Sequence, residues 1–194
     1  FLRAGIHIRH TEGFNPHAYV SIPLPLSVGF SSQCELMEFG LEEGCTMEEL
    51  PQKMNQVLPA GIVIHDCYEG GLPFRALSFV RYDISLEFDG NMAQAAGEAF
   101  QELVSRDHFI VQKRSKKAKR GFTEVDLIPL IEGVETVQAQ GDTLSLTLLL
   151  QAQNPGLSPS VLLQGFQTAY PSFVPVYSSC HRREILDQEK NVYR

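Results

Sequence analysis

Residues 79–88 read FVRYDISLEF, in which apolar and polar side chains alternate. A period of two predicts a strand with one buried face. Asn91 then predicts the cap of a helix that runs to about Ser105. The elements expected after it are strands at 108–113, 143–151 and 176–186, with a helix at 158–170 between the last two. This βαββαβ order is that of the ferredoxin-like split motif.

The first 73 residues show part of the same order. Alternation predicts strands at 5–10 and 35–41, and residues 62–67 read as a further strand. Thr46 predicts the cap of a helix at 47–58. Residues 1–5 resemble the last turn of a helix closed by Gly5, so we expect this half to lack its N-terminal strand and helix. The prediction is an α+β fold of two ferredoxin-like halves, 1–73 (truncated) and 74–194. Residues 121–141, which contain Pro129, are expected to form an ordered insertion in the second half.

Composition narrows the classes of function. The 194 residues are 43% hydrophobic and carry a net charge of −7, with 16 Lys and Arg against 23 Asp and Glu. Bulk electrostatics therefore disfavour nucleic acid and anionic membranes, and any anion binding must be local. The longest apolar stretches fall short of the ~20 residues that span a bilayer. No signal peptide is visible, so we expect no membrane partner and a cytoplasmic protein.

The four cysteines are widely spaced and form no metal or cluster motif. We expect reduced thiols that pack as small hydrophobic groups. The alternative is a nucleophile assisted by a neighbouring histidine, for which His65 and Cys67 are better placed than Cys180 and His181, because adjacent strand residues face opposite ways. No Gly-rich phosphate loop or nucleophile elbow is present, so we expect no cofactor in this chain.

The motif TEGFNPH at 11–17, followed by the proline-rich stretch 21–29, predicts a stiff, irregular loop. Loops of this kind often carry recognition or catalysis. We expect Glu12, Phe14, Asn15 and His17 to contact a substrate or partner, with His17 as the candidate general base. The alternative is that the His17 ring only caps a turn. Because alternation puts His7 and His10 on opposite strand faces, no metal site is expected.

The second informative motif is basic. Residues 113–120 read KRSKKAKR and hold 6 of the chain's 16 basic residues. One reading is a solvated hairpin loop. The other is a phosphate-contacting arm in which Phe122 stacks on a base. The residues of this candidate RNA-binding segment are Lys113, Arg114, Lys116, Lys117, Lys119, Arg120 and Phe122.

Three stretches together carry a family resemblance: GFNPH at 13–17, PLPLSVG at 23–29, and TEVDLIPLI at 123–131 after the basic run. They resemble the bacterial radical-SAM-linked domain family, a domain of unknown function found beside, or fused to, a radical S-adenosylmethionine protein. The resemblance implies that the partner holds the iron-sulfur cluster. It assigns no catalytic residue to this chain.

The leading hypothesis is an accessory or substrate-binding module for that radical enzyme, not catalytic on its own, whose candidate targets include RNA and ribosome-associated molecules. The loop at 13–17 and the basic run would form its recognition surface. The first alternative is an enzyme subunit in which His17 performs acid-base chemistry, helped by Glu12 and Asn15. The second is a structural protein-protein interaction domain without a ligand.

Overall fold

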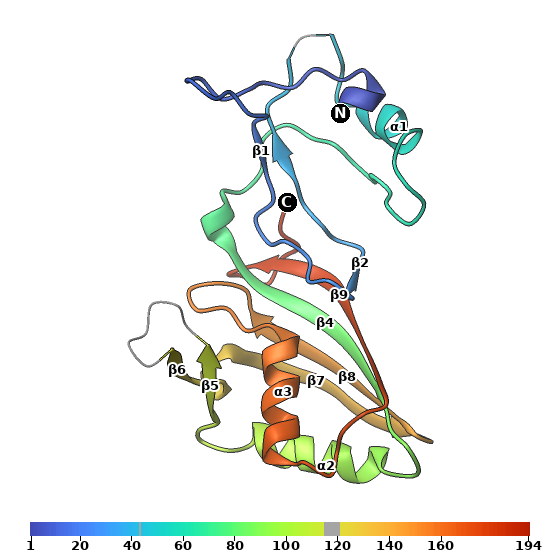
Figure 1. Cartoon of the computed structure of the whole chain (residues 1–194), viewed down its shortest axis with the longest axis vertical. Coiled ribbons are helices and arrows are strands. Elements are labelled where there is room, and N and C mark those ends of the chain that lie inside the picture. The colour runs from blue at the N-terminus through green and yellow to red at the C-terminus, as the bar shows by residue number, and fades with distance from the viewer. Residues whose placement is uncertain (43, 115–120) are drawn as a thin grey trace. The chain divides into compact units, whose positions relative to one another are not determined.

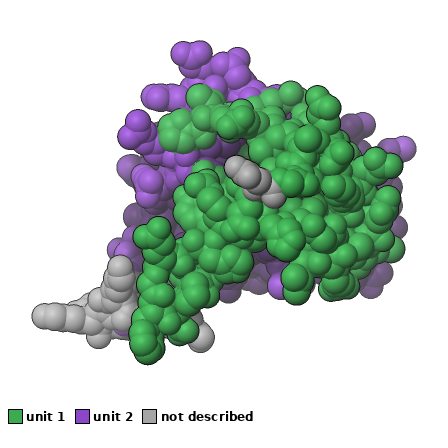
Figure 2. All heavy atoms as spheres, turned by 90° about the horizontal axis from the view of Figure 1, so that it is seen from above, with its two compact units in different colours: residues 1–25, 35–73, 194 green, residues 26–34, 74–193 purple. Residues whose placement is uncertain are grey.

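The computed structural model describes residues 1–42, 44–114 and 121–194, and the side chain of Arg114 lies outside this description. The chain divides into two compact units, which Figure 2 distinguishes by colour. Unit 1 comprises residues 1–25, 35–73 and 194, and unit 2 comprises residues 26–34 and 74–193. The fold is mixed, with helices and several sheets, as expected of the α+β class.

Unit 2 is built on a five-stranded sheet with the order β2-β9-β4-β8-β7. The four long strands are antiparallel to their neighbours, whereas the short β2 runs parallel to β9. The strands of this sheet are β2 (Ser31–Ser32), β4 (Leu77–Glu87), β7 (Ile131–Gln140), β8 (Thr143–Gln151) and β9 (Tyr177–Asp187). The predicted alternation is real in β4, where Val80, Tyr82, Ile84 and Leu86 are all buried.

Two helices, α2 (Ala93–Val104) and α3 (Pro159–Ala169), lie over one face of this sheet (Figure 1). Phe100 of α2 and Phe166 of α3 are fully buried and meet edge to face with ring centroids 5.7 Å apart. Ser158 caps α3 by accepting a hydrogen bond from the Ser160 amide, as its sequence predicts. The expected Asn91 cap is wrong, because α2 begins after Met92 and has no side-chain cap.

The segment between α2 and β8 corrects the sequence prediction. The strand expected at His108–Lys113 is β5 (Ile110–Arg114), which pairs with β6 (Phe122–Asp126) as a separate hairpin. A 3-10 turn, η3 (Ile128–Leu130), leads from this hairpin into β7. The edge strand of the main sheet is therefore β7, inside the predicted insertion at 121–141. Two register shifts, between Ile131 and Gly133 and between Val134 and Thr136, interrupt the alternation of β7, and residues 134–136 are all exposed.

Unit 1 contains little regular structure. Its elements are η1 (Leu2–Ala4), β1 (Val20–Ser21), β3 (Glu38–Phe39) and α1 (Leu50–Asn55), and β1 pairs antiparallel with β3. A 3-10 turn, η2 (Phe74–Ala76), begins the second segment of unit 2. A small core holds unit 1 together, with Ile6, Ile8, Leu50 and Met54 buried at its centre.

The regular elements predicted for unit 1 are mostly too long. The strand expected at 5–10 reduces to single bridges, Ile8 with Leu41 and His10 with Ala18. The strand expected at 35–41 reduces to Glu38–Phe39, and residues 62–67 form no strand. Instead, the Asn55 side chain accepts a hydrogen bond from the Ile64 amide (2.8 Å) and donates one to its carbonyl (2.9 Å). Side-chain hydrogen bonds thus take the place of strand pairing at Ile64. A strand-like sequence alone does not guarantee a pairing partner.

The helix expected at 47–58 is also shorter in the structure. Thr46 does accept a hydrogen bond from the Glu49 amide at 3.3 Å, so its hydroxyl caps the turn that leads into α1. Residues 47–49 form turns rather than helix, and Pro51 occupies the first helical turn. A proline there is compatible with helix initiation because its missing amide has no helical partner to lose.

Candidate functional site

The motif at 11–17 forms the tip of a hairpin in unit 1. The Thr11 amide donates to the His17 carbonyl (2.8 Å), and the Tyr19 amide donates to the Arg9 carbonyl (2.8 Å). His10 and Ala18 form the antiparallel bridge between these two bonds. Only the five residues 12–16 therefore lie beyond the paired strands, which makes the tip short.

Thr11 and His17 brace the tip with their side chains. The Thr11 hydroxyl accepts a hydrogen bond from the His17 amide at 3.1 Å and lies 3.1 Å from Nδ1 of the imidazole. Nδ1 also lies 3.4 Å from the Asn15 carbonyl oxygen. When the hydroxyl donates to Nδ1, the ring carries its proton on Nε2. These local contacts hold Nδ1 of the ring against the loop.

Phe14 is the most conspicuous residue of the tip. Its side chain is fully exposed, with a relative accessibility of 107%. Gly13 precedes it with φ +135°, a backbone conformation that residues with a side chain rarely adopt. Glu12, Asn15 and Pro16 are also exposed. The tip therefore presents an aromatic ring flanked by a carboxylate and an amide.

Three backbone hydrogen bonds anchor the base of this hairpin in a ring. The Tyr19 amide donates to Arg9, the Gly40 amide to Tyr19 (3.2 Å), and the Arg9 amide to Gly40 (2.7 Å). The Arg9 side chain lies over Gly40, where an added Cβ would be 2.6 Å from Nε of the guanidinium. A side chain at position 40 would therefore have to displace the Arg9 side chain, a contact that the sequence pattern did not reveal.

The basic run belongs to unit 2, whereas the motif at 11–17 belongs to unit 1. Lys113 is exposed on β5, and the backbone of Arg114 pairs with Phe122, whose side chain is 49% exposed. Lys116, Lys117, Lys119 and Arg120 lie outside the described residues. The structure thus describes strand β5, on which the basic run begins, and strand β6, which follows the end of the run.

The base of the same hairpin carries a hydrogen-bonded side-chain pair that sequence reasoning missed. Nδ1 of His108 lies 2.6 Å from Oδ2 of Asp126, while Oδ1 of Asp126 accepts the amides of Phe109 (2.9 Å) and Ile128 (3.2 Å). The His108 contact, followed by the Phe109 amide, lowers the pKa of the Asp126 carboxyl. Only the β5–β6 register brings these two residues together, so no local spacing signals the pair.

All four cysteines are free thiols. Burial raises the pKa of Cys180 to about 11. Partial burial, then the nearby Asp66 and Cys45, raise the pKa of Cys67. Because the thiolate is the nucleophile, these shifts oppose nucleophilic use of either thiol at neutral pH. The geometry favours the packing role for both.

The described residues also give information on metal sites and on membrane-spanning helices. No group of three or more His, Cys, Asp or Glu side chains in residues 1–42, 44–114 and 121–194 is arranged to hold a metal ion. Over the same residues, no helix has the length and apolarity needed to cross a membrane.

Together, these features define an α+β protein of two units, with a braced aromatic loop on one and a β-hairpin bearing the basic run on the other. The chain belongs to the bacterial family described as "Uncharacterized protein conserved in bacteria (DUF2344)", which it matches over residues 1–159. This agrees with the resemblance to a bacterial domain of unknown function, although the link to a radical enzyme is not part of the match. No curated protein and no solved structure matches the chain.

Proposed function

We propose that this chain is a recognition module that acts with a radical S-adenosylmethionine protein encoded beside it or fused to it. The observation that carries this role is the fully exposed Phe14 ring at the tip closed by Thr11 and His17. The class of the partner comes from the sequence resemblance. In this proposal the partner performs the radical chemistry, and this chain docks to it or holds its substrate.

The physical case for docking rests on preorganisation. Aromatic side chains are enriched among the residues that dominate binding energy at protein interfaces. The Thr11–His17 bonds already hold the tip, and Gly13 permits the backbone conformation that the tip requires. A partner would therefore not need to order the loop before covering the ring. Covering a phenyl ring completely stabilises a complex by roughly 1.5–3 kcal/mol.

A test is co-purification of the chain with the encoded radical protein. Phe14→Ala should weaken the complex by about tenfold or more. Val28→Ala is the matched control, because Val28 is an equally exposed apolar side chain that belongs to unit 2. Failure of the wild-type chain to bind the radical protein would overturn the proposal. Binding with no change in the radical enzyme's activity would favour a purely structural interaction domain.

The second candidate function is acid-base chemistry by His17, favoured by the fixed orientation of its ring. The two functions differ in what His17→Ala changes. If His17 moves a proton, the variant loses turnover in the reconstituted pair while complex formation is retained. If His17 only braces the tip, the variant weakens the complex, and the turnover of the complex that remains is unchanged.

We also propose that the basic run contacts RNA. Its support is the concentration of 6 of 16 basic residues in 113–120 and the half-exposed Phe122 beside it. The probe is a single-stranded oligouridylate. Replacing Lys116, Lys117, Lys119 and Arg120 by Ala should weaken binding and reduce its dependence on salt. The proposal would be contradicted if the wild type did not bind the probe, or if its binding did not depend on the salt concentration.

For the fold we propose a ferredoxin-like relationship in unit 2. The supporting order is β4-α2-β7-β8-α3-β9, with the four strands adjacent as β9-β4-β8-β7 and all antiparallel. The β5–β6 hairpin is then the insertion between α2 and β7. We extend the proposal to unit 1 only as the truncated half predicted from sequence. Cross-strand amide contacts measured by NMR test the pairing in unit 2.

A further inference from the structure

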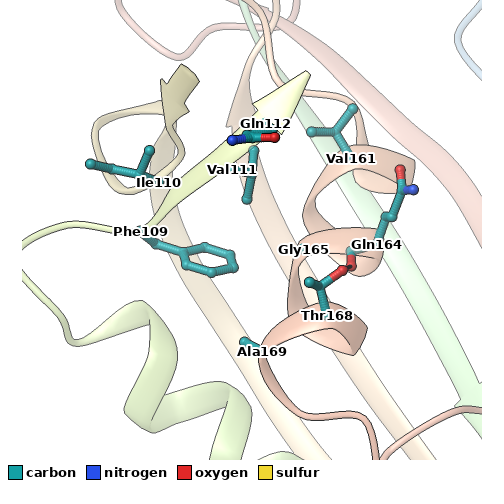
Figure 3. A pocket seen from close by; sticks show the side chains of 9 residues that line it. All are labelled: Phe109, Ile110, Val111, Gln112, Val161, Gln164, Gly165, Thr168 and Ala169. Carbon is teal, nitrogen blue, oxygen red and sulfur yellow. Dashed lines mark hydrogen bonds between the residues drawn. The ribbon is translucent and has the colours of Figure 1, made fainter. Parts of the chain in front are cut away.

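A cavity of about 460 Å³ lies between the β5 strand and helix α3 within unit 2. Residues 109–112 form one side of it and five residues of α3 form the other (Figure 3). The α3 side presents small or apolar groups from Val161, Gly165 and Ala169, together with the polar Gln164 and Thr168. None of the lining residues is charged.

Helix α3 approaches this strand closely at Gly165. An added Cβ there would lie 2.9 Å from Cγ1 of Val111 and 3.0 Å from Cε1 of Phe109. The Phe109 ring points toward α3, whereas the Ile110 side chain points away from it (Figure 3) and is 60% exposed. Ile110 therefore borders the cavity with its main chain.

The main chain at this border has hydrogen-bonding groups to offer. The Leu127 amide donates to the Phe109 carbonyl at 2.8 Å, and hydrogen-bonded pairs alternate along an antiparallel ladder. Val111 and Lys113 therefore bond to β6, while Ile110 and Gln112 direct their N–H and C=O groups to the opposite edge. In the described part of the chain, β5 pairs with no strand other than β6.

We propose that this groove binds an extended peptide segment of a partner protein, added as a strand along the outer edge of β5. Such addition uses main-chain hydrogen bonds for affinity and alternate side chains for specificity. The apolar lining selects small apolar side chains at alternate positions of the peptide. This inference goes beyond the proposed role of Phe14 and is independent of it.

Charge identifies the rest of the occupant. A phosphate-bearing ligand would lose hydration in a groove without a cationic lining residue, and this is costly. The basic run 113–120 is covalently continuous with the far end of β5, and Lys113 on that strand is exposed. We therefore expect the peptide to carry acidic residues at the end that lies beside Lys113.

The experiment starts from a phage-displayed library of random nonapeptides selected on the full chain. Gln164→Trp provides the counter-selection, because Gln164 is an exposed lining residue and indole would fill the groove without entering the core. Enriched peptides are then synthesised with a fluorophore and titrated by anisotropy. We expect sequences with alternating small apolar residues and an acidic terminus.

The decisive variants are a pair of prolines on facing residues. Gln112→Pro removes an amide from the outer edge of β5, whereas Glu124→Pro makes the same change on the outer edge of β6, because Gln112 and Glu124 are register partners. We expect Gln112→Pro to weaken peptide binding by about tenfold and Glu124→Pro by less than about twofold. Gln101→Trp, on the exposed side of α2, is the control for added indole, and circular dichroism checks each variant's fold.

Four results would overturn the proposal. One is the absence of any peptide enriched on the wild type over Gln164→Trp, and another is equal binding of the enriched peptides to Gln112→Pro. A third is binding of oligouridylate to the wild type that both displaces the peptide and is abolished by Gln164→Trp, which would assign the groove to RNA. The fourth is self-association of the wild type that Gln112→Pro abolishes, which would assign it to a second copy of the chain.

Discussion

The two units satisfy their backbone hydrogen bonds in different ways. Unit 2 uses ladders, and its strands β4 and β9 each run for 11 residues. In the described part of unit 1, no strand exceeds two residues, and side chains such as Asn55, Thr11 and Thr46 bond to the backbone instead. Unit 2 therefore derives its stability from a packed sheet, whereas unit 1 has a small core that fixes its loops. Loops held in this way are suited to recognition.

The largest effect on stability is expected in the core of unit 2. Phe166→Ala removes a fully buried ring that contacts Phe100 and should lower the free energy of unfolding by about 3–5 kcal/mol. Urea denaturation followed by circular dichroism measures it. A loss below about 1 kcal/mol would show that α2 and α3 are not packed as described.

A smaller effect is expected from the side-chain bonds of unit 1. Asn55→Ala removes both hydrogen bonds to the Ile64 backbone and should cost about 1–2 kcal/mol. Gln56→Ala, at the neighbouring exposed position, is the control. Amide exchange of residues 62–66 should accelerate in Asn55→Ala but not in Gln56→Ala. Equal exchange in the two variants would contradict the bracing role of Asn55.

The pH dependence tests the hairpin base of unit 2. Because His108 and two amides lower the pKa of Asp126 from its ordinary 3.8, the carboxylate contributes stability that is fully present above that value. This contribution is lost as pH falls through the lower pKa of the folded state. Asp126→Asn should therefore make the thermal midpoint less sensitive to acid between about pH 5 and pH 2. Parallel acid profiles for the variant and the wild type would exclude this role.

The smallest effect on stability is expected at the tip of unit 1. Because the Phe14 side chain is fully exposed, Phe14→Ala should change the free energy of unfolding by no more than about 0.5 kcal/mol. Thermal denaturation measures this. A larger loss would mean that the ring supports the fold, and the role of unit 1 as a presenter of loops would need revision.

The same contrast explains what the sequence could predict. Alternation identified β4, and the strands predicted at 143–151 and 176–186 correspond to β8 and β9. Ser158 with Pro159 identified the start of α3. The edge strand β7 was not predicted, because two register shifts interrupt its alternation. In unit 1, the strand predicted at 5–10 reduces to single bridges and the one predicted at 62–67 does not form. A strand also needs a pairing partner, and at Ile64 the chain supplies the Asn55 side chain instead.

The candidate sites divide similarly. The motif at 11–17 was recognisable as a stiff, irregular loop because Pro16 restricts its backbone and Gly13 permits a conformation that other residues rarely adopt. The Thr11–His17 brace agrees with the cap reading of His17. The pair His108 and Asp126 and the groove beside Gly165 depend on strand register and on helix packing. Neither follows from local spacing, so both required the structure.

The central claim is that the braced tip of unit 1 docks to a radical S-adenosylmethionine protein. Hydrogen-deuterium exchange of this chain, alone and mixed with the encoded radical protein, tests it most directly. We expect added protection at residues 12–17 in the mixture and none at residues 27–29, which include the equally exposed Val28. Unchanged exchange at the tip in a mixture that forms a complex would contradict it.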